Sequence, residues 1–276
     1  IPVQKGLNVD MSKYPHMLIC GVTGFGKSYF VNYIIAMASY KGAILFLSDP
    51  KNSDLALLSN YIPEENVAVK TQDIVAQVKK VREIMDERYE RINELKAGTK
   101  GVNQMFNDFD IPMILLVLEE MGALVAGLNR KQKEEFNDHL KQILLQGRQA
   151  GVEVLLVTQQ PNTNNIPSEI RDQCNFRVFL GNPKTQAKSM IFGDNHEYME
   201  RTYDVGEGLY MLEGKTQDPK LIQTPYYDGE AFRSIYEDIY NLQYIYRDNS
   251  DSVYMNMYTE LSGTTSDVSD KEGVEV

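Results

Sequence analysis

The sequence has little of several features that mark other classes of protein. Only two of its 276 residues are cysteines, Cys20 and Cys174, which are far apart and form no C-x-x-C pair. Neither a disulfide framework nor a cysteine metal site is indicated, and a reducing compartment fits. No apolar run reaches the ~18 residues that a membrane-spanning helix needs, because Glu119 and Glu120 interrupt the strongest candidate, residues 113–126. The chain opens with Ile1, so we expect a fragment whose membrane anchor, if it has one, lies upstream.

Net positive charge is also lacking. The chain carries 28 Lys and Arg against 39 Asp and Glu, a formal net charge of −11 at pH 7. This excludes a wholly basic nucleic-acid-binding surface. Residues 248–276 hold seven acids and one base, so this tail carries −6 and leaves −5 for everything before it. We therefore expect the body of the protein to be only mildly acidic.

What the sequence does contain is a phosphate-binding loop. Residues 21–28, Gly-Val-Thr-Gly-Phe-Gly-Lys-Ser, match G-x-x-x-x-G-K-[ST] at every defined position. Glycines let backbone N–H groups close around phosphates, and the positive end of the following helix favours the same anion. Lys27 is expected to contact the β- and γ-phosphates, and the Ser28 hydroxyl to take one Mg²⁺ position. We predict binding of ATP or GTP.

Apolar runs and amphipathic stretches alternate along the chain and predict one large α/β domain. Helices are expected at residues 28–38, 71–96 and 131–146, the last two stopped by Gly98 and Gly147. Such alternation implies βαβ units, hence a mainly parallel sheet with helices on both faces. The expected strands are residues 16–20, 43–47, 112–118, 152–158, 175–180 and 208–212.

The C-terminal part of the chain differs in composition. Residues 232–246 form a tyrosine-rich helical stretch, which more often packs on a core than stacks on bases. After Leu261 the composition is that of a disordered tail. We therefore divide the chain into a large α/β domain at 1–228, a tyrosine-rich helical extension packing on it at 229–261, and an acidic disordered tail at 262–276.

A hydrolase also needs acids beside the phosphate loop. The apolar run 114–118 leads directly into Glu119 and Glu120, and strand ends of a parallel sheet open on the ligand crevice. Glu119 is predicted to approach Mg²⁺, directly or through water, and Glu120 to polarise the attacking water. The alternative is that the two acids only begin an exposed helix, where the dipole favours them.

Two further polar residues follow apolar segments. Gln159, after the strand at 152–158, is placed to hydrogen-bond the γ-phosphate and the lytic water, or is an ordinary exit from a strand. Arg148 lies between Gly147 and Gly151. It is either a charge that suits the C-terminus of a helix or a guanidinium offered to a neighbour's triphosphate.

Taken in order, these pieces resemble the motor domain of the FtsK/SpoIIIE DNA translocases, from about Tyr14 to about Leu212. The resemblance implies a RecA-like P-loop NTPase core that assembles as a ring, usually a hexamer, with ATP between subunits and double-stranded DNA in the pore. The matching segments are PHMLICGVTGFGKS, LSDPKNSDL, MDERYERIN, PMILLVLEEMGALV, LLQGRQAGVEVLLVTQQP, IPSEIRDQCNFRVFLGNPKTQAKSMI and VGEGLYML.

The resemblance also assigns roles to single positions. It implies a catalytic set of Lys27, Glu119, Glu120, Gln159 and Arg148, the arginine acting in trans. Lys184 and Lys188 match a basic stretch of the family. The implied nucleotide-binding residues are Gly21, Val22, Thr23, Gly24, Phe25, Gly26, Lys27, Ser28, Tyr29, Asp49 and Lys51, and the implied Mg²⁺ ligands are Ser28 and Glu119.

Three departures from the family pattern stand out. The metal-associated aspartate is here Glu119, one methylene longer, and Mg²⁺ demands tight octahedral geometry. The family's TQRP is TQQP, with neutral Gln160. No winged-helix module follows the motor, which puts sequence-directed loading in doubt. Stripped-down members of this kind are coupling proteins of Gram-positive conjugative elements, of the TcpA type, which normally have membrane helices before the motor.

We therefore expect an ATPase that moves double-stranded DNA in conjugation, with ATP and Mg²⁺ as cofactors and relaxase or other transfer proteins as further partners. The motor would be cytoplasmic and tethered to the inner face of the membrane through a segment absent from this chain. Residues 129–133, with three bases, are a candidate pore loop or a solvated helix start. The alternatives are a motor that moves secreted proteins and a nucleotide-binding assembly subunit with weak hydrolysis.

Overall fold

The computed structural model describes residues 1–53, 55–97, 101, 103–199, 201–227, 237 and 239. The expected tyrosine-rich extension and acidic tail therefore lie outside the described residues, apart from positions 237 and 239. Among the residues described, no helix is both long enough and apolar enough to cross a membrane.

The described elements alternate between strand and helix along the chain. The strands are β1 Pro2–Gln4, β2 Leu7–Asn8, β3 Met17–Gly21, β4 Ile44–Ser48, β5 Val67–Ala68, β6 Ile114–Leu118, β7 Val152–Thr158, β8 Phe176–Leu180, β9 Glu207–Leu212 and β10 Lys220–Gln223. The α-helices are α1 Lys27–Tyr40, α2 Thr71–Ala97, α3 Met121–Gly127, α4 Arg130–Ala150, α5 Ser168–Arg171 and α6 Thr185–Phe192. The 3-10 helices are η1 Ala56–Asn60, η2 Glu64–Asn66 and η3 Phe106–Phe109.

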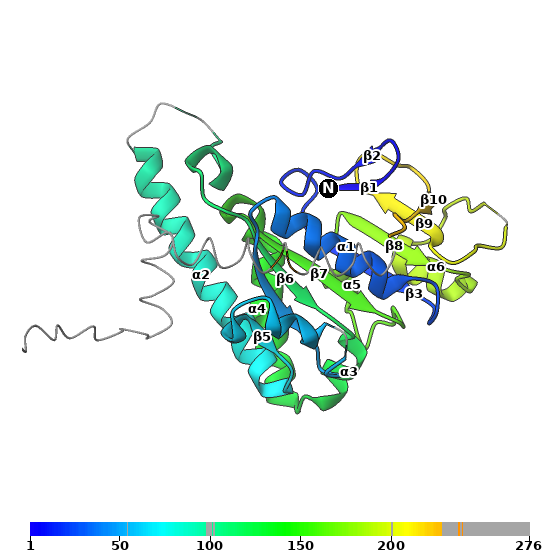
Figure 1. Ribbon diagram of the computed structural model, residues 1–276, viewed down its shortest axis with the longest axis horizontal. Helices are drawn as coiled ribbons and strands as arrows, with labels where there is room; N and C mark the ends of the chain where they lie inside the picture. The colour runs from blue at the N-terminus through cyan, green and yellow to red at the C-terminus, as the bar shows by residue number, and fades with distance from the viewer. Residues whose placement is uncertain are drawn as a thin grey trace, which may run out of the picture.

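One sheet runs through the centre of the molecule (Figure 1), and within the described residues its strand order is β10-β9-β8-β3-β7-β6-β4-β5. The strands from β8 to β5 are parallel to their neighbours, whereas β9 and β10 are antiparallel additions at one edge. Strand β3 lies between β7 and β8, so the chain leaves it in the middle of the sheet. In parallel sheets this position, where the order of the strands reverses, opens a crevice at the carboxyl ends.

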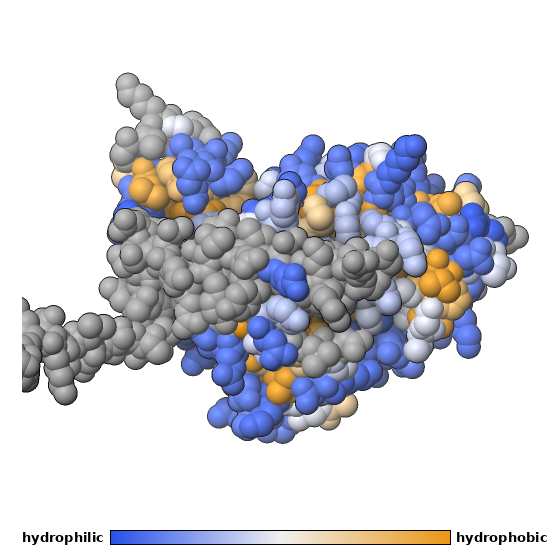
Figure 2. All heavy atoms as spheres, in the orientation of Figure 1, coloured by the Kyte–Doolittle hydropathy of each residue, from blue (hydrophilic) through white to orange (hydrophobic). Residues whose placement is uncertain are grey.

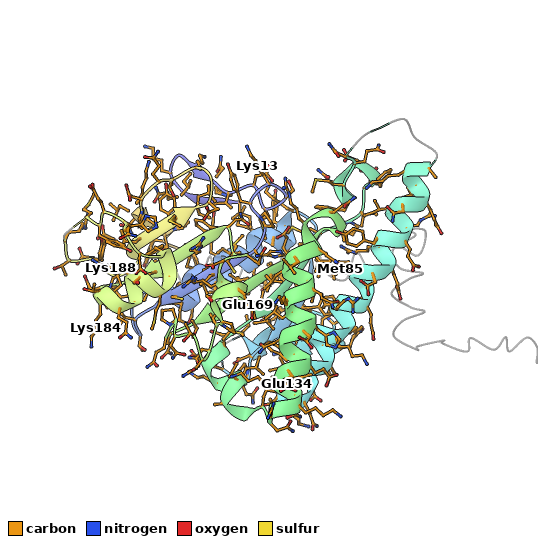
Figure 3. The ribbon with its side chains drawn as sticks, turned by 180° about the vertical axis from the view of Figure 1, so that it is seen from behind. Lys13, Met85, Glu134, Glu169, Lys184 and Lys188 are labelled. Carbon is orange, nitrogen blue, oxygen red and sulfur yellow. The ribbon has the colours of Figure 1, made fainter. Side chains whose placement is uncertain are left out.

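Helices cover both faces of the sheet. Helix α1 lies on the face seen in Figure 1, and α4, with α2 beside it, covers the face seen from behind in Figure 3. Alternate residues of β6 divide accordingly: Leu115 and Val117 join the core on the side of α1, while Leu116 and Leu118 join the core under α2 and α4. Because successive side chains point to opposite faces and both faces are buried, the strand is apolar throughout.

The predicted mainly parallel α/β fold with helices on both faces is confirmed, and each strand and helix predicted before residue 228 has a counterpart within a few residues. One helix end is wrong. Helix α4 continues through Gly147 to Ala150 and is capped by Gly151, which has the left-handed φ of 71°. Gly147 is needed for a different reason, since a Cβ there would lie 2.2 Å from the carbonyl oxygen of Val152. Close packing of the helix end on β7, and not helix termination, therefore explains this glycine.

Candidate active site

The phosphate loop connects the end of β3 to the start of α1, as the sequence predicts. Gly24 and Gly26 have φ values of 85° and 86°, a left-handed conformation that glycine adopts without steric cost. A Cβ on Gly24 would meet nothing within 4 Å, so its glycine serves backbone conformation alone. Lys27 is buried at the first position of α1, and Ser28 beside it is exposed. The loop thus presents an open concave backbone at a helix N-terminus.

A segment far along the chain holds the loop in place. The N–H of Gly206 donates to the carbonyl of Phe25 at 3.1 Å, and the N–H of Val22 donates to the carbonyl of Leu180 at the same distance. The Phe25 ring lies on Gly181, where a Cβ would approach it to 2.7 Å. The loop is therefore fixed on one side by the connections that follow β8 and precede β9. Sequence reasoning recognised the VGEGLYML segment only as a family match and missed this contact.

The two predicted acids follow β6, one strand beyond the neighbour of β3. The N–H of Glu119 donates to the carbonyl of Ser48 at 2.9 Å, which ties this position to the end of β4. Glu120 is 8% exposed and has a φ of 47°, unusual for a residue with a side chain. Its carbonyl accepts from the N–H of Ala123, so Glu120 begins α3. The pair therefore lies at the carboxyl ends of the strands and also starts a helix, and its catalytic role stays a prediction.

The loop after β4 reaches the same place. Lys51 Nζ lies 3.3 Å from Oε2 of Glu120. The Asp49 carboxylate is fully buried and accepts hydrogen bonds from the N–H groups of Lys51, Ser53 and Ala56 and from the Ser53 hydroxyl. Asp49 thus shapes the loop that carries Lys51. Lys51 is the residue of this loop that contacts Glu120, the predicted catalytic base.

Gln159 follows the carboxyl end of β7, the strand adjacent to β3, and is exposed. The next residues fold back: the Gln160 N–H donates to the Thr158 hydroxyl, and the Asn165 amide donates to the Gln160 carbonyl at 3.2 Å. A Cβ on Gly122 would lie 2.9 Å from Nδ2 of Asn165 and 3.6 Å from Oε1 of Glu120. Asn165 and the Glu120 carboxylate therefore both lie next to Gly122, an arrangement that no sequence pattern indicated.

The site is underlain by a buried thiol. Burial raises the pKa of Cys20 well above its ordinary value; the charge of Lys27 opposes this shift, and that of Glu120 adds to it. Cys20, in β3, therefore lies within electrostatic range of both Lys27 and Glu120. A protonated, fully buried thiol is chemically inert.

Arg148 lies at the amino-terminal end of the parallel strands, opposite the carboxyl end where the phosphate loop lies. It is in the last turn of α4, just before β7 begins, and its Nε donates to the carbonyl of Ser12 at 3.0 Å. The two ends of the sheet are separated by the seven residues of β7. At the usual rise per residue this strand is about 23 Å long. The side chain is exposed and cannot span that distance. Arg148 is therefore not assembled with the other predicted catalytic residues of its own chain.

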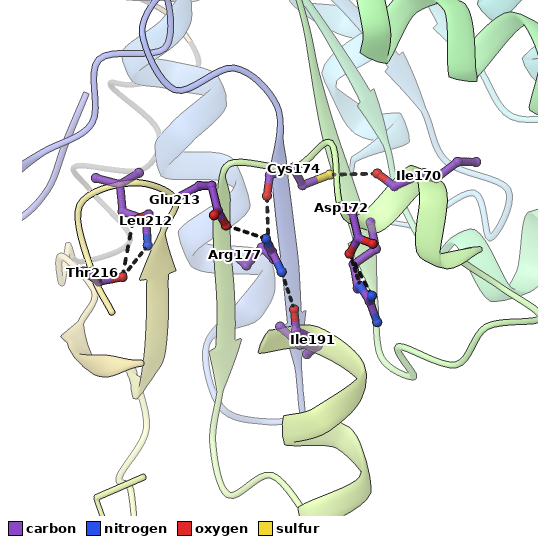
Figure 4. A network of polar contacts seen from close by, with 9 residues as sticks. Ile170, Asp172, Cys174, Arg177, Ile191, Leu212, Glu213 and Thr216 are labelled. Carbon is purple, nitrogen blue, oxygen red and sulfur yellow. Dashed lines mark hydrogen bonds and ion pairs between the residues drawn. The ribbon is translucent and has the colours of Figure 1, made fainter. Parts of the chain in front are cut away.

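The predicted basic positions fall in two separate places. Lys184 precedes α6, and Lys188 lies on it. Figure 3 shows both on one side of the molecule, away from Glu134, which lies near the start of α4 and next to the other basic positions at 129–133. Lys188 Nζ lies 4.8 Å from the centre of the Tyr198 ring. Buried Arg177 of β8 anchors this region, donating to the carbonyls of Cys174 and Ile191 and pairing with Glu213 (Figure 4).

The candidate pore loop is the ordered start of a helix. Asn129 caps α4 by accepting from the Gln132 N–H, and the Gln132 side chain accepts from the Asn129 N–H in return. Arg130 pairs with Glu134 one turn later at 2.9 Å. The side chain of Arg130 is 94% exposed. Lys133 Nζ donates to the carbonyl of Asn164. The solvated helix start is thus seen, and it keeps an accessible base beside the loop after β7.

Tyr29, in the first turn of α1, meets the last described stretch of the chain. Its ring centre lies 5.6 Å from that of Tyr227, whose hydroxyl donates to the Tyr29 carbonyl. Tyr29 is still 57% exposed, and Val22 and Val205 near the loop are also exposed. Figure 2 shows the face around α1 as mostly hydrophilic, with only small separate hydrophobic areas where it is not covered by grey atoms.

These residues fit a nucleoside triphosphate and its metal. The left-handed glycines, the open space at Gly24 and the buried Lys27 form a cradle for phosphates at the start of α1. Ser28 and Glu119 supply oxygen donors of the kind that Mg²⁺ prefers. The fold and the site therefore define a P-loop ATPase of RecA-like architecture.

Comparison with known proteins agrees with this class. The FtsK/SpoIIIE family model matches residues 1–180. The chain is 32% identical over 208 residues to Ftsk domain-containing protein YdcQ of Bacillus subtilis (strain 168), covering 75% of this chain and 43% of that protein. It is 31% identical over 215 residues to DNA translocase FtsK of Streptococcus pneumoniae (strain ATCC BAA-255 / R6), covering 69% and 27%. The chain thus spans less than half the length of these relatives.

Two solved structures share the fold. The conjugation coupling protein TcpA of pCW3, a monomer form with ATPgS, has a TM-score of 0.66 at 19% identity over 83% of this chain and 66% of that chain. EssC (ATPases 2 and 3) from Geobacillus thermodenitrificans has a TM-score of 0.64 at 15% identity over 86% and 45%. The family match covers more than half of the chain, and the chain belongs to the FtsK/SpoIIIE family.

The predictions of fold class and family are confirmed, and the family and its structural neighbours are ATPases, as expected. The roles of single site residues, the use of Mg²⁺, the ring and its cargo stay predictions. Geometry brings Lys27, Glu119, Glu120, Gln159, Lys51 and the phosphate loop to one edge of the sheet and leaves Arg148 at the other.

Proposed function

We propose that this chain is the ATPase motor of a ring, usually of six copies, that moves double-stranded DNA. The observation that carries the proposal is the separation of Arg148 from its own phosphate loop by the length of β7. An exposed arginine at that edge can meet a triphosphate only in a neighbouring copy. Head-to-tail contacts between copies generate rings when the rotation closes.

The residues then divide the work of phosphoryl transfer. The loop and Lys27 bind and orient the triphosphate, and Ser28 and Glu119 are the residues that would hold Mg²⁺, which would supply positive charge beside the phosphates. Glu120 accepts a hydrogen bond from the attacking water, and its contact with Lys51 holds the side chain in place. Gln159 binds the γ-phosphate or the same water. Arg148 of the neighbouring copy stabilises the charge of the transition state.

Relatives named as DNA translocases support DNA as the cargo. The overall negative charge is compatible with this, because only pore-facing groups need to neutralise phosphates. Arg130 and Lys133 at the start of α4, and Lys184 and Lys188 at α6, are the candidate bases. Of these, Lys133 contacts the loop after β7, which leaves the carboxyl end of the sheet, and Arg130 lies in the same first turn of α4.

The test is the ATPase rate with and without linear duplex DNA, alongside a mass measurement for hexamers. We expect duplex DNA to raise the rate and salt to suppress the stimulation, since phosphate contacts release counterions. Arg130→Ala together with Lys133→Ala should weaken the stimulation and leave the DNA-free rate unchanged. An ATPase rate that duplex DNA does not raise at low salt would overturn the proposal.

A second cargo has its own support. The structural neighbours include secretion ATPases, among them EccC of Thermomonospora curvata in complex with a signal sequence peptide. The same motor would then move protein. Stimulation by a secreted peptide and not by DNA would favour this alternative. A third possibility, an assembly subunit with weak hydrolysis, is motivated by Glu119 and is favoured if neither cargo raises the rate.

The biological setting that we propose is conjugative transfer of a plasmid or transposon, in line with the fold shared with a conjugation coupling protein. The motor would work in the cytoplasm, tethered to the inner face of the membrane by a segment outside this chain, with a relaxase or another transfer protein as partner. Co-purification of the full-length protein with membranes and with relaxase–DNA complexes tests this setting.

A further inference from the structure

Arg88 is a large charged residue that is 1% exposed, in the middle of α2. One guanidinium nitrogen donates to the carbonyls of Ala150 at 2.9 Å and Gly151 at 3.2 Å. The other donates to the carbonyl of Pro112 at 3.0 Å. Burial lowers the pKa of Arg88 to about 9, so the group stays charged at neutral pH. The buried guanidinium thus binds two main-chain oxygens at the end of α4 and a third, that of Pro112, just before β6.

The next residue of α2 repeats the pattern. The hydroxyl of Tyr89 donates to the carbonyl of Gln146 at 2.6 Å, four residues before Ala150. The last carbonyls of a helix lack intrahelical partners and carry the negative end of its dipole, so a cation there is favourable. Arg88 and Tyr89 together therefore hold the last turn of α4, which is the turn that presents Arg148.

Other contacts close the same corner. A Cβ on Gly151 would lie 2.4 Å from the Phe106 ring, so η3 packs directly against the cap. Arg148 itself is tied to the carbonyl of Ser12. The corner has few ways to shift without breaking one of these bonds. A rigid support of this kind is what a group acting across a subunit interface needs, since a displacement of about 1 Å can cost roughly 10²-fold in rate.

We propose that Arg88 is a positioning residue for Arg148: it fixes the end of α4 so that Arg148 meets the triphosphate of the neighbouring copy. This inference rests on the trans role of Arg148 proposed above. Arg88 is too deeply buried to reach nucleotide or DNA, and it lies at the end of the sheet opposite its own phosphate loop. Its substitution should therefore impair hydrolysis in the neighbour's site and leave ATP binding in its own site intact.

The test is subunit mixing with Arg88→Met, measured as ATP hydrolysis on linear duplex DNA. Alone, Arg88→Met should lower kcat by about 10²-fold, with little change in KM for ATP. Mixed with Glu120→Gln, it should regain activity, because roughly one interface in four then joins an intact Glu120 site to an intact Arg148 corner. Mixed with Arg148→Ala, it should regain nothing, because both variants lack the same function.

A merely structural loss does not give this pattern. Arg91→Met, one turn along α2, removes an ion pair with Glu94 near the surface and should keep the parental kcat in every mixture. If Arg88→Met is rescued by Arg148→Ala and not by Glu120→Gln, Arg88 acts on its own site through Pro112 and β6, and the inference is overturned. Parental kcat in Arg88→Met alone overturns it too.

The same experiment tests the proposed function separately from the role of Arg88. If Arg148→Ala is not rescued by Glu120→Gln, the trans role itself is wrong, whatever Arg88 does. Should Arg88→Met fail to fold, Tyr89→Phe removes one hydrogen bond from the same turn and keeps the ring. It should lower kcat by a smaller factor and be rescued only by Glu120→Gln; rescue by Arg148→Ala contradicts the inference.

Discussion

Lys51 and Glu120 form an ion pair at the carboxyl end of the sheet, with 3.3 Å between Nζ and Oε2. They come from the loops that follow β4 and β6, adjacent strands of the sheet. The side chain of the lysine is 47% exposed and that of the glutamate 11%. An ion pair half open to water contributes less than about 1 kcal/mol to folding. Its value therefore lies in orienting the carboxylate that we propose as the base.

We predict that Lys51→Met lowers kcat for ATP hydrolysis about 10-fold, because Glu120 loses the partner that orients it. The melting temperature should change by no more than about 2 °C, as expected for a pair near the surface. Steady-state kinetics and thermal melting check both statements. Lys79→Met, which removes an exposed pair on α2, is the control. An unchanged or higher kcat in Lys51→Met would contradict an orienting role.

Glu120→Gln should abolish most hydrolysis, by about 10²–10⁴-fold, since an amide cannot accept the proton of the attacking water. ATP affinity should stay within a few-fold, because the amide has the same shape and the phosphate loop is untouched. Nucleotide titration and single-turnover hydrolysis provide the measurements. Glu134→Gln, at an exposed position of α4, should behave as the parent. Hydrolysis at the parental rate in Glu120→Gln would remove it from the catalytic set.

Gly147→Ala should destabilise the protein by about 2 kcal/mol, although alanine favours helices. The added Cβ would lie 2.2 Å from the Val152 carbonyl oxygen, and the helix end must move away from β7 to relieve the contact. Arg148 follows directly, so kcat should fall as well. Urea unfolding of Gly147→Ala and of Gln142→Ala, an exposed position one turn earlier, gives the comparison. Equal stability of the two variants would show that the corner is not closely packed.

Glu153 and His16 form a buried neutral pair under the same corner. His16 Nδ1 accepts from the Val154 N–H, so its Nε2 carries the proton and donates to the Leu144 carbonyl. Burial lowers the pKa of His16 to about 4 and raises that of Glu153 to about 8. Both groups are therefore uncharged near neutral pH, and the main-chain N–H of His16 donates to Glu153 Oε2 at 2.8 Å.

The sign of the pH dependence follows from the carboxyl group. The folded state holds the Glu153 proton up to about pH 8, whereas the unfolded chain releases it near its ordinary pKa. Stability from this group is fully present below that ordinary value and falls as pH rises toward 8. Glu153→Gln imitates the protonated acid and should remove the fall. We expect its melting temperature to exceed that of the parent by about 5 °C at pH 9 and to match it at pH 5.

The histidine acts in the opposite sense. Its pKa is lowered on folding, so its stabilising contribution is present above the ordinary pKa and is lost as pH falls toward 4. Both the parent and Glu153→Gln should therefore lose stability below pH 6. If the melting curves of parent and variant shift in parallel from pH 5 to pH 9, Glu153 is already ionised in the folded protein.

Much of the nucleotide edge could be predicted from sequence because its residues are local. The phosphate loop, Glu119–Glu120 and Gln159 each follow an apolar strand, and parallel strands bring their carboxyl ends to one edge. Contacts between distant segments could not be predicted in this way. Nothing in the periodicity pairs Gly206 with Phe25 or places Asn165 next to Gly122.

Residue types and their order along the chain point to the chemistry: a phosphate-loop motif, two acids, an amide and an arginine on an α/β chain of a known family. The position of the arginine relative to the other residues comes from the fold. Its helix turn is fixed at the opposite edge by Arg88 and by the close approach of Gly147 to Val152. Side-chain and main-chain contacts of this kind mostly join residues that are far apart in the chain. A local sequence pattern therefore does not reveal them.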